Sequence, residues 1–464
     1  MRIVRILFSL LVACSATSLS ARVTLDYNDG YQLFGTILPT SILNKESRQM
    51  LKDEGTGISE RFFLSMSMYG QKATTARDLK KQAVPVADVH GHLNMIGLLY
   101  GTLPQGVVQP TLLQAAAQQT YYWPQPPVNN PLFSNSTYTD ETQQFGFFSN
   151  AGKYHKIGLR FTAAVRIFED LIFSIQAGVA DLQQTTTLID LTPISSAQNV
   201  YPASTSFVLS FTPDQTTAEQ FLMEPARAIF KQLGAVVDTD IQKTGAEDVS
   251  LYATLRHNFP VNQDADPEDW PYFIFTPIIQ IGGTIAVAKP KNPDVIYDLC
   301  LGNNKHQSVN IAGGFSFDFA ETLELDFFAG LTHFFNRTYL ARVPTSIYQS
   351  VLFPYSTMIT VKPGNSWFVS LGINAYHFLE NLSVYVQYLY TAHLIDTVTL
   401  VTPDPAFLPS RLAEDSPFKI QVANFGFDYD LSPNFSLGVG YQMPLARRGA
   451  YKANTVLLNA TFTF

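Results

Sequence analysis

The stretch from Asn454 to Phe464 constrains the fold most, because alternate positions along it are apolar throughout. Successive side chains of a β-strand point to opposite faces, so this pattern predicts a strand with one apolar face, long enough to cross a bilayer at a tilt. Terminal residues in water usually fray, so an aromatic end favours a lipid environment. The apolar face carries Val456, Leu458, Ala460, Phe462 and Phe464.

Pairs of strands with the same alternation, joined by short turns, recur from Ile157 onward. No outward position of these strands carries Asp, Glu, Lys or Arg, although charged residues make up 15% of the chain. A charge facing lipid costs about 2–4 kcal/mol at mid-bilayer, whereas the wet face of a soluble sandwich usually carries Lys and Glu. The pattern therefore favours a membrane barrel over a soluble sandwich. The clear pairs are 157–167 with 171–179, Val309–Phe317 with Leu323–Leu331, Trp367–Ala375 with Leu382–Tyr390, and Phe425–Tyr429 with Phe435–Met443, and Val249–Arg256 with Phe273–Ile285 forms a looser pair.

In its alternation and its terminal Phe464, the C-terminal stretch resembles the final strand of bacterial outer-membrane β-barrel proteins, with no narrower family identified. The resemblance implies an all-β, porin-like, transmembrane antiparallel up-and-down barrel, integral to the cell outer membrane. We expect about 14 strands, with roughly 12 to 16 admissible. The resemblance further implies contact with outer-membrane lipids and with the barrel assembly machinery, for which the apolar C-terminal residues form the assembly signature. The resemblance is also compatible with a homotrimer.

The N-terminal part divides into two segments before the barrel. Residues 1–21 are typical of a secretory signal peptide, with Arg2 and Arg5 before the apolar core Ile6–Val12. The residues before Cys14 also resemble a lipoprotein-processing box, so lipid attachment there is an alternative. Residues 22–58 are polar and predict a periplasmic or plug-like leader, and residues 59–464 predict the barrel. Without Cys14, Cys300 has no partner for an internal disulfide.

Short and long connections alternate along the barrel region, as in outer-membrane barrels. The short turns lie on the side of the C-terminus and are predicted to be periplasmic, so the long connections are predicted to be extracellular. The first barrel strands are predicted at Phe62–Gly70 and His90–Gly101. The longest connection, residues 183–247, contains a predicted helix at Pro225–Leu233 and is expected to cap the mouth or fold into the lumen. The other long connections are Ala286–His306, Phe334–Asn365 and Ala392–Ser416.

The strongest enzyme-like string is Asp88-Val89-His90-Gly91-His92, which is similar to the opening metal motif of amidohydrolase-type enzymes. That family needs a parallel barrel with further ligands, and this chain carries no second matching motif. Two polar side chains facing the lumen are the favoured alternative. We therefore predict no catalytic residue, no metal and no cofactor. An outer-membrane barrel hydrolase, with His333, His393 and Asp396 near a rim, stays a second alternative.

Charged residues on inward rows form the candidate pore lining. Arg160, Arg166 and Arg256 would make a basic arc, and Glu324 and Asp326 an acidic one. Opposed arcs focus a transverse field across a narrow lumen. The alternative is that these residues lie near the short turns, paired or solvated.

The inner rows are rich in Gly, Ser, Thr, Asn and Gln, which line water well and fill a dry core badly. The sequence therefore predicts a channel for passive diffusion of small polar solutes or ions. A structural or adhesive barrel that presents its loops is the alternative. A formal net charge of −8 argues against nucleic acid as a partner. The leader also lacks the Asn-Pro-Ala string expected of the fatty-acid channel family.

Overall fold

The computed structural model describes residues 62–94, 103–106, 147–168, 170–191, 231–237, 240–260, 273–319, 322–347, 349–379, 381–432 and 434–464. The predicted signal peptide (1–21) and leader (22–58) lie outside these residues, as does most of the predicted helix at Pro225–Leu233.

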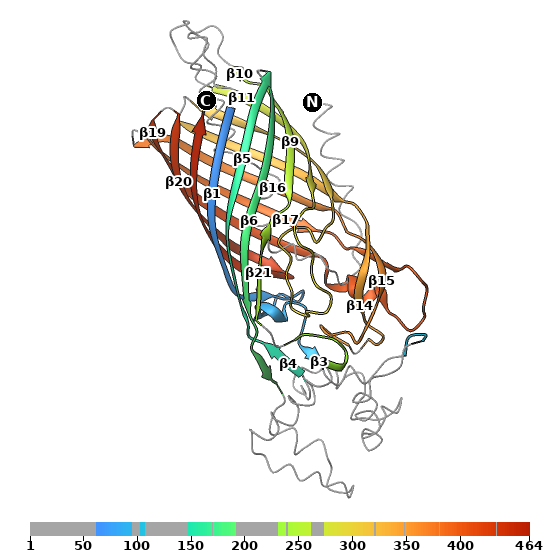
Figure 1. Cartoon of the computed structure of the whole chain (residues 1–464). Helices are drawn as coiled ribbons and strands as arrows, with labels where there is room; N and C mark the ends of the chain where they lie inside the picture. Colours follow the sequence, from blue (N-terminus) through green and yellow to red (C-terminus); the bar gives the residue numbers. More distant parts are fainter. Residues whose placement is uncertain are drawn as a thin grey trace, which may run out of the picture.

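Within the described residues, twelve tilted antiparallel strands close into one barrel, because the last strand pairs with the first (Figure 1). Closure leaves no open edge in the ring, which is what a sheet exposed to lipid requires. The strands in ring order are β1 (Phe62–Arg77), β5 (Lys153–Phe168), β6 (Leu171–Thr185), β9 (Val249–Arg256), β11 (Phe273–Ile285), β12 (Ser308–Phe319), β13 (Leu323–Phe334), β16 (Ser366–Leu379), β17 (Leu382–His393), β19 (Phe418–Ser432), β20 (Phe435–Arg448) and β21 (Ala450–Thr463). β8 (Ile241–Ala246) continues the line of β9 along β6.

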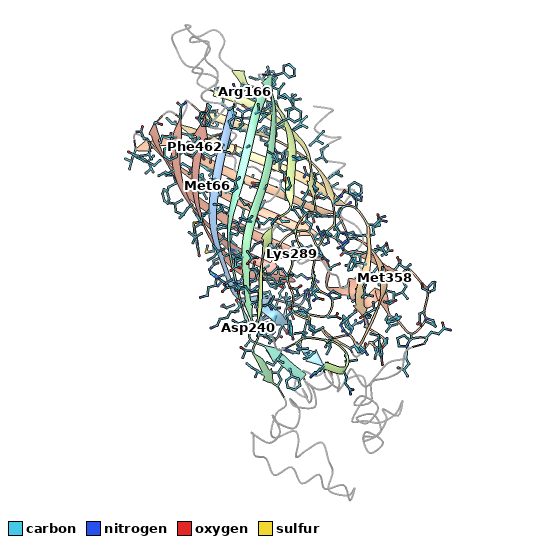
Figure 2. The ribbon with its side chains drawn as sticks, in the orientation of Figure 1. Met66, Arg166, Asp240, Lys289, Met358 and Phe462 are labelled. Carbon is cyan, nitrogen blue, oxygen red and sulfur yellow. The ribbon has the colours of Figure 1, made fainter. Side chains whose placement is uncertain are left out.

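The outer surface carries a belt of exposed apolar side chains, among them Met66 at 41% exposure (Figure 2). The apolar belt ends at the same height on β1, β5 and β6. Gly70 of β1 pairs with Ile157 of β5, and Ile157 pairs with Asp181 of β6. On the side of the short turns the outward positions are apolar. On the other side they become polar: Lys72, Thr74, Lys153, His155 and Gln183. The predicted outward rows are therefore confirmed, and the C-terminal alternation lies in β21 with Val456 and Leu458 outside.

The ring has twelve strands, which lies within the predicted range of 12 to 16 around an expected number of about 14. One prediction about the strands needs correction. The stretch His90–Gly101 is not the second barrel strand as far as it is described, because β3 (Leu93–Asn94) pairs with β4 (Phe147–Asn150) in a separate sheet. β1 pairs directly with β5 instead. Apolar alternation cannot tell a strand that faces lipid from one buried under a loop.

The long connections lie together at one end of the barrel, which we call the long-connection end, and the short turns and the C-terminus lie at the other, the short-turn end (Figure 1). The predicted limits of three long connections, Ala286–His306, Phe334–Asn365 and Ala392–Ser416, are confirmed to within two residues. One antiparallel sheet outside the ring joins β14 (Arg337–Val343), β15 (Tyr355–Lys362) and β18 (Thr397–Leu400). Its buried Val343, Ile359 and Val361 pack with Phe418 of the barrel wall, so this end is covered by a folded cap.

The remaining short elements are β2 (Ala83–Pro85), the 3-10 helices η2 (Val86–Asp88) and η4 (Ala413–Asp415), β7 (Leu188–Asp190), β10 (Phe259–Pro260) and the helix α8 (Pro409–Leu412). No helix in the described ranges is long and apolar enough to cross a membrane.

Candidate solute pathway through the barrel

Two segments enter the barrel mouth at the long-connection end. The connection between β11 and β12, residues 286–307 (the inner connection), buries Leu299 and Leu301. Residues 83–94 bury Val86 and Val89 in the same cluster, together with inward-facing tyrosines of the wall. Among the described residues, these two segments lie between the long-connection end and the lumen.

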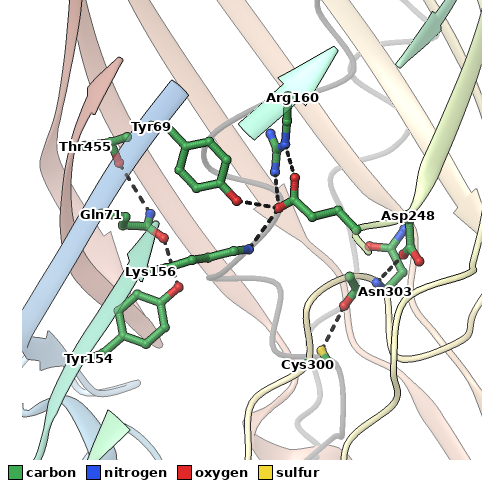
Figure 3. Close-up of polar contacts among 11 residues, drawn as sticks. Tyr69, Gln71, Tyr154, Lys156, Arg160, Asp248, Cys300, Asn303 and Thr455 are labelled. Atoms are coloured by element: carbon green, nitrogen blue, oxygen red, sulfur yellow. Dashed lines mark hydrogen bonds and ion pairs between the residues drawn. The ribbon is translucent and has the colours of Figure 1, made fainter. Parts of the chain in front are cut away.

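A cluster of buried charged groups lies on the lumen side of the inner connection (Figure 3). The Glu247 carboxylate accepts hydrogen bonds from Arg160 Nε, from Arg160 Nη2 at 2.7 Å and from the Tyr69 hydroxyl at 2.7 Å. Lys156 Nζ lies 3.1 Å from Glu247 Oε1. Two cations thus share one carboxylate, and the Arg160 guanidinium also lies 5.0 Å from the centre of the Tyr69 ring. The cluster carries a net positive charge.

The backbone places Glu247 at the end of β8, just before a β-bulge. β6 pairs with β8 as far as Val179↔Ala246 and with β9 from Gln176↔Ser250, which leaves one extra residue on the β8–β9 side. Glu247 N still donates to Gly178 O at 2.9 Å. Glu247 therefore continues the inward row of β8, and the extra residue that follows it returns β9 to the phase in which Leu251 and Leu255 face outward.

Glycine on the neighbouring strand makes room for the cluster. Tyr69 pairs with Gly158, where an added Cβ would lie 2.3 Å from the Tyr69 ring, and a Cβ at Gly178 would lie 2.5 Å from Glu247 Oε2. The ring therefore lies flat on the strand backbone, as aromatic side chains do over strand glycines.

The adjacent Asp248 connects the same bulge to the inner connection. Its carboxylate accepts hydrogen bonds from Ala288 N at 2.9 Å and from Asn303 N at 2.5 Å. A charged acceptor makes each of these bonds stronger than a neutral one. The bulge thus joins the barrel wall, the charged cluster and the inner connection.

Two cavities lie on either side of the inner connection. A cavity of about 130 Å³ at the mouth (the mouth cavity) is lined by Leu299, by Tyr154 and Tyr451 of the wall, and by Val86, Ala87, Val89 and His90. A cavity of about 70 Å³ (the mid-lumen cavity) is lined by Leu301 and by the Arg160–Glu247 pair. The second is polar, and its volume has room for water molecules. The stretch from Leu299 to Leu301 separates the two cavities.

The five predicted pore residues do not converge on one constriction. Arg160 lies in the charged cluster, while Arg166 is nearer the short-turn end of the same strand, on the order of 20 Å away at about 3.3 Å per residue (Figure 2). Arg256 and the two acids also lie near short turns. The Glu324 carboxylate accepts a hydrogen bond from Tyr376 at 2.5 Å, and Asp326 accepts one from Asn374 at 2.8 Å.

Sequence reasoning missed Tyr69, Lys156 and Glu247. Lys156 occupies the same inward row of β5 as Arg160, so the period of two could have found it. Glu247 had no comparable signal, because β8, whose alternation turns it inward, was predicted as part of a long connection.

The enzyme-like residues contribute to structure. His92 Nδ1 lies 3.2 Å from Asp88 Oδ2, and the described residues contain no group of three or more His, Cys, Asp and Glu arranged to hold a metal. At the end of β17, His393 lies 2.8 Å from both Ser366 Oγ and Asp396 Oδ1. All three side chains are buried, and the imidazole stacks on the Phe418 ring at 5.5 Å. A hydrolytic serine needs access to substrate, so this arrangement favours a structural role.

Two titratable groups of the inner connection have shifted pKa values. Burial lowers the pKa of His306, whose Nδ1 lies 2.9 Å from Phe335 O. Burial also raises the pKa of Tyr297. Both shifts favour the neutral form, so the inner connection is most stable with uncharged side chains at these positions.

A closed antiparallel ring with an apolar, charge-free outer belt and a polar interior defines a transmembrane β-barrel of the outer-membrane class. No family model matches the chain, and no curated protein matches it.

Comparison with solved structures finds other barrels of this class. An outer-membrane channel from Pseudomonas putida F1 aligns with a TM-score of 0.45 and 10% identity over 89% of this chain and 99% of that one. The monoaromatic hydrocarbon channel CymD aligns with a TM-score of 0.33 and 11% identity over 95% and 99%. The NanC porin aligns with a TM-score of 0.28 and 7% identity over 67% and 94%. Likenesses this distant assign no solute to this chain.

Proposed function

We propose that this protein is a narrow, weakly selective channel that lets small polar solutes or ions diffuse across the outer membrane. The observation that carries the proposal is the mid-lumen cavity, a polar space inside the barrel bordered by the Arg160–Glu247 pair. A lumen that served only as a structural core would favour apolar side chains, because buried charges are costly. Most inward-facing polar side chains are nevertheless buried, so the channel is narrower than the open bore of a large porin.

The orientation follows from the connections. We place the long-connection end outside the cell and the short turns in the periplasm, as in other barrels of this class. Solutes then enter past the cap, cross the inner connection and meet the charged cluster. Assembly by the barrel assembly machinery and formation of a homotrimer stay predictions.

Selectivity is the finer part of the proposal. Lys156 and Arg160 favour anions in the mid-lumen, while Glu247 and the adjacent Asp248, which also lines the mid-lumen cavity, oppose them. The acids Glu324 and Asp326 also act against anions nearer the short-turn end. The net preference is therefore weak.

Planar-bilayer recording of the purified, folded barrel tests the proposal. We expect ion conductance, and we expect Arg160→Ala and Arg166→Ala to shift the reversal potential in a salt gradient toward cation preference. Arg411→Ala, which alters a half-exposed arginine of α8 outside the ring, serves as the control and should leave the reversal potential near that of the wild type.

A folded barrel that conducts no ions would refute the channel. A barrel that presents its loops would then explain the fold better, because the β14–β15–β18 sheet exposes Leu340 and Met358 outside the ring.

A further inference from the structure

The mouth cavity has the composition of a ligand site. Apolar and aromatic side chains from six separate parts of the chain form most of its lining, and a few polar side chains complete it. Ligand pockets typically combine such a wall with a small number of placed polar groups. The apolar part includes Val86, Val89, Tyr154, Leu299, Phe353 and Tyr451.

The size of the cavity limits the ligand. Its volume of about 130 Å³ is close to the roughly 150 Å³ of an engineered apolar cavity that binds benzene. One six-membered ring therefore fits, and a long acyl chain or an oligosaccharide does not. The shape of the site thus selects a small compound with an apolar body.

Gln184 of β6 supplies the polar contact. Its side chain is 4% exposed and lines the cavity, and its Oε1 has no hydrogen-bond partner among the described residues. A buried acceptor left without a donor destabilises the fold. A ligand that donates one hydrogen bond to Gln184 Oε1 removes that cost.

The backbone beside the cavity is held in a strained conformation. Val351 lines the cavity with a φ of +64°, a region that β-branched residues rarely adopt. Leu352 N donates to Ser350 O at 2.7 Å across this residue, and Ser350 Oγ donates to His92 O at 2.7 Å. The fully buried Leu352 also fixes the turn. Such strain persists only where surrounding contacts impose it, and it is concentrated at ligand sites.

We propose that the mouth cavity binds an uncharged single-ring compound that carries one hydrogen-bond donor, of the phenol type, with its ring against Tyr154 and Tyr451 and its donor on Gln184 Oε1. The inference rests on the proposed function in one respect, since it names a class of solute that halts at the channel entrance. Binding itself does not require conduction.

Calorimetric titration of the folded full-length barrel in detergent tests the site. We expect saturable binding of phenol at one site per chain. Phenol should bind about three- to tenfold more tightly than toluene, which has the same ring without the donor. Gln184→Leu keeps the volume and removes the acceptor, so it should weaken phenol binding about three- to tenfold and leave toluene binding unchanged. Gln183→Leu, an exposed neighbour outside the cavity, is the matched control and should bind both ligands as the wild type does.

A second variant tests the cavity independently of Gln184. Ala87→Leu fills part of the lining and should abolish binding of both compounds. Heat-modifiable migration on gels reports that each variant is folded. Phenol binding that is not saturable, that is equal in Gln184→Leu, or that is weaker than binding of benzoate would overturn the assignment.

Conductance of the same preparations separates the two proposals. Conduction without phenol binding would reject the site and keep the channel. Phenol binding without conduction would reject the channel and keep the site.

Discussion

Replacement of Glu247 by glutamine tests the charged cluster most directly. Lys156 is 0% exposed and Arg160 is 6% exposed, so both cations stay in the lumen when their shared carboxylate is removed. Leaving a buried charge without its partner costs about 3–5 kcal/mol. We therefore expect Glu247→Gln to lower the free energy of unfolding by about 4 kcal/mol.

The measurement is equilibrium unfolding in urea, with the folded barrel in detergent. Glu414→Gln removes a carboxylate of similar chemistry from the half-exposed pair with Arg411 and should cost less than about 1 kcal/mol. The double variant Lys156→Met/Glu247→Gln also removes one of the two cations that lose this carboxylate. Its free energy of unfolding should therefore be higher than that of Glu247→Gln alone.

Electrical recording gives a second readout of the same change. Glu247→Gln raises the net charge of the cluster, so the reversal potential should move toward anion preference, opposite in sign to the effect of Arg160→Ala. A loss of stability no larger than that of Glu414→Gln would refute the cluster as a buried ion group. A shift toward cations would refute its place on the conduction path.

Three further changes test other parts of the pathway. Gly158→Ala forces a Cβ into the Tyr69 ring and should cost about 1–3 kcal/mol in urea unfolding, whereas Gly70→Ala, with open space around its Cβ, should change stability by less than about 0.5 kcal/mol. Asp248→Asn weakens two hydrogen bonds that hold the inner connection and should raise single-channel conductance, and unchanged conductance would count against that connection as the constriction. Burial lowers the pKa of His306 in the folded protein, so protonation favours the unfolded chain once the pH falls below about 6.5. The free energy of unfolding should then fall by at most about 1.4 kcal/mol per pH unit, and His306→Gln should flatten this part of the stability profile.

The strand pattern and the lipid-facing surface could be predicted from the sequence. The connection predicted as Phe334–Asn365 matches the observed limits, since β13 ends at Phe334 and β16 begins at Ser366. Lipid acts on each outward position separately, because every side chain that faces it must be apolar. A strand of period two therefore carries the information locally, and the pattern needs no knowledge of which strand lies beside it.

The contents of the lumen depended on the tertiary structure. Glu247 meets Arg160 and Tyr69 across 87 and 178 positions of the chain, and the pairing of β8 with β6 turns its side chain inward beside Gly178. Leu93–Asn94 pairs outside the ring for a related reason, since a buried loop offers its side chains the same apolar environment as lipid. Contacts between distant segments follow from the strand register and the path of the connections, and neither leaves a local pattern in the sequence.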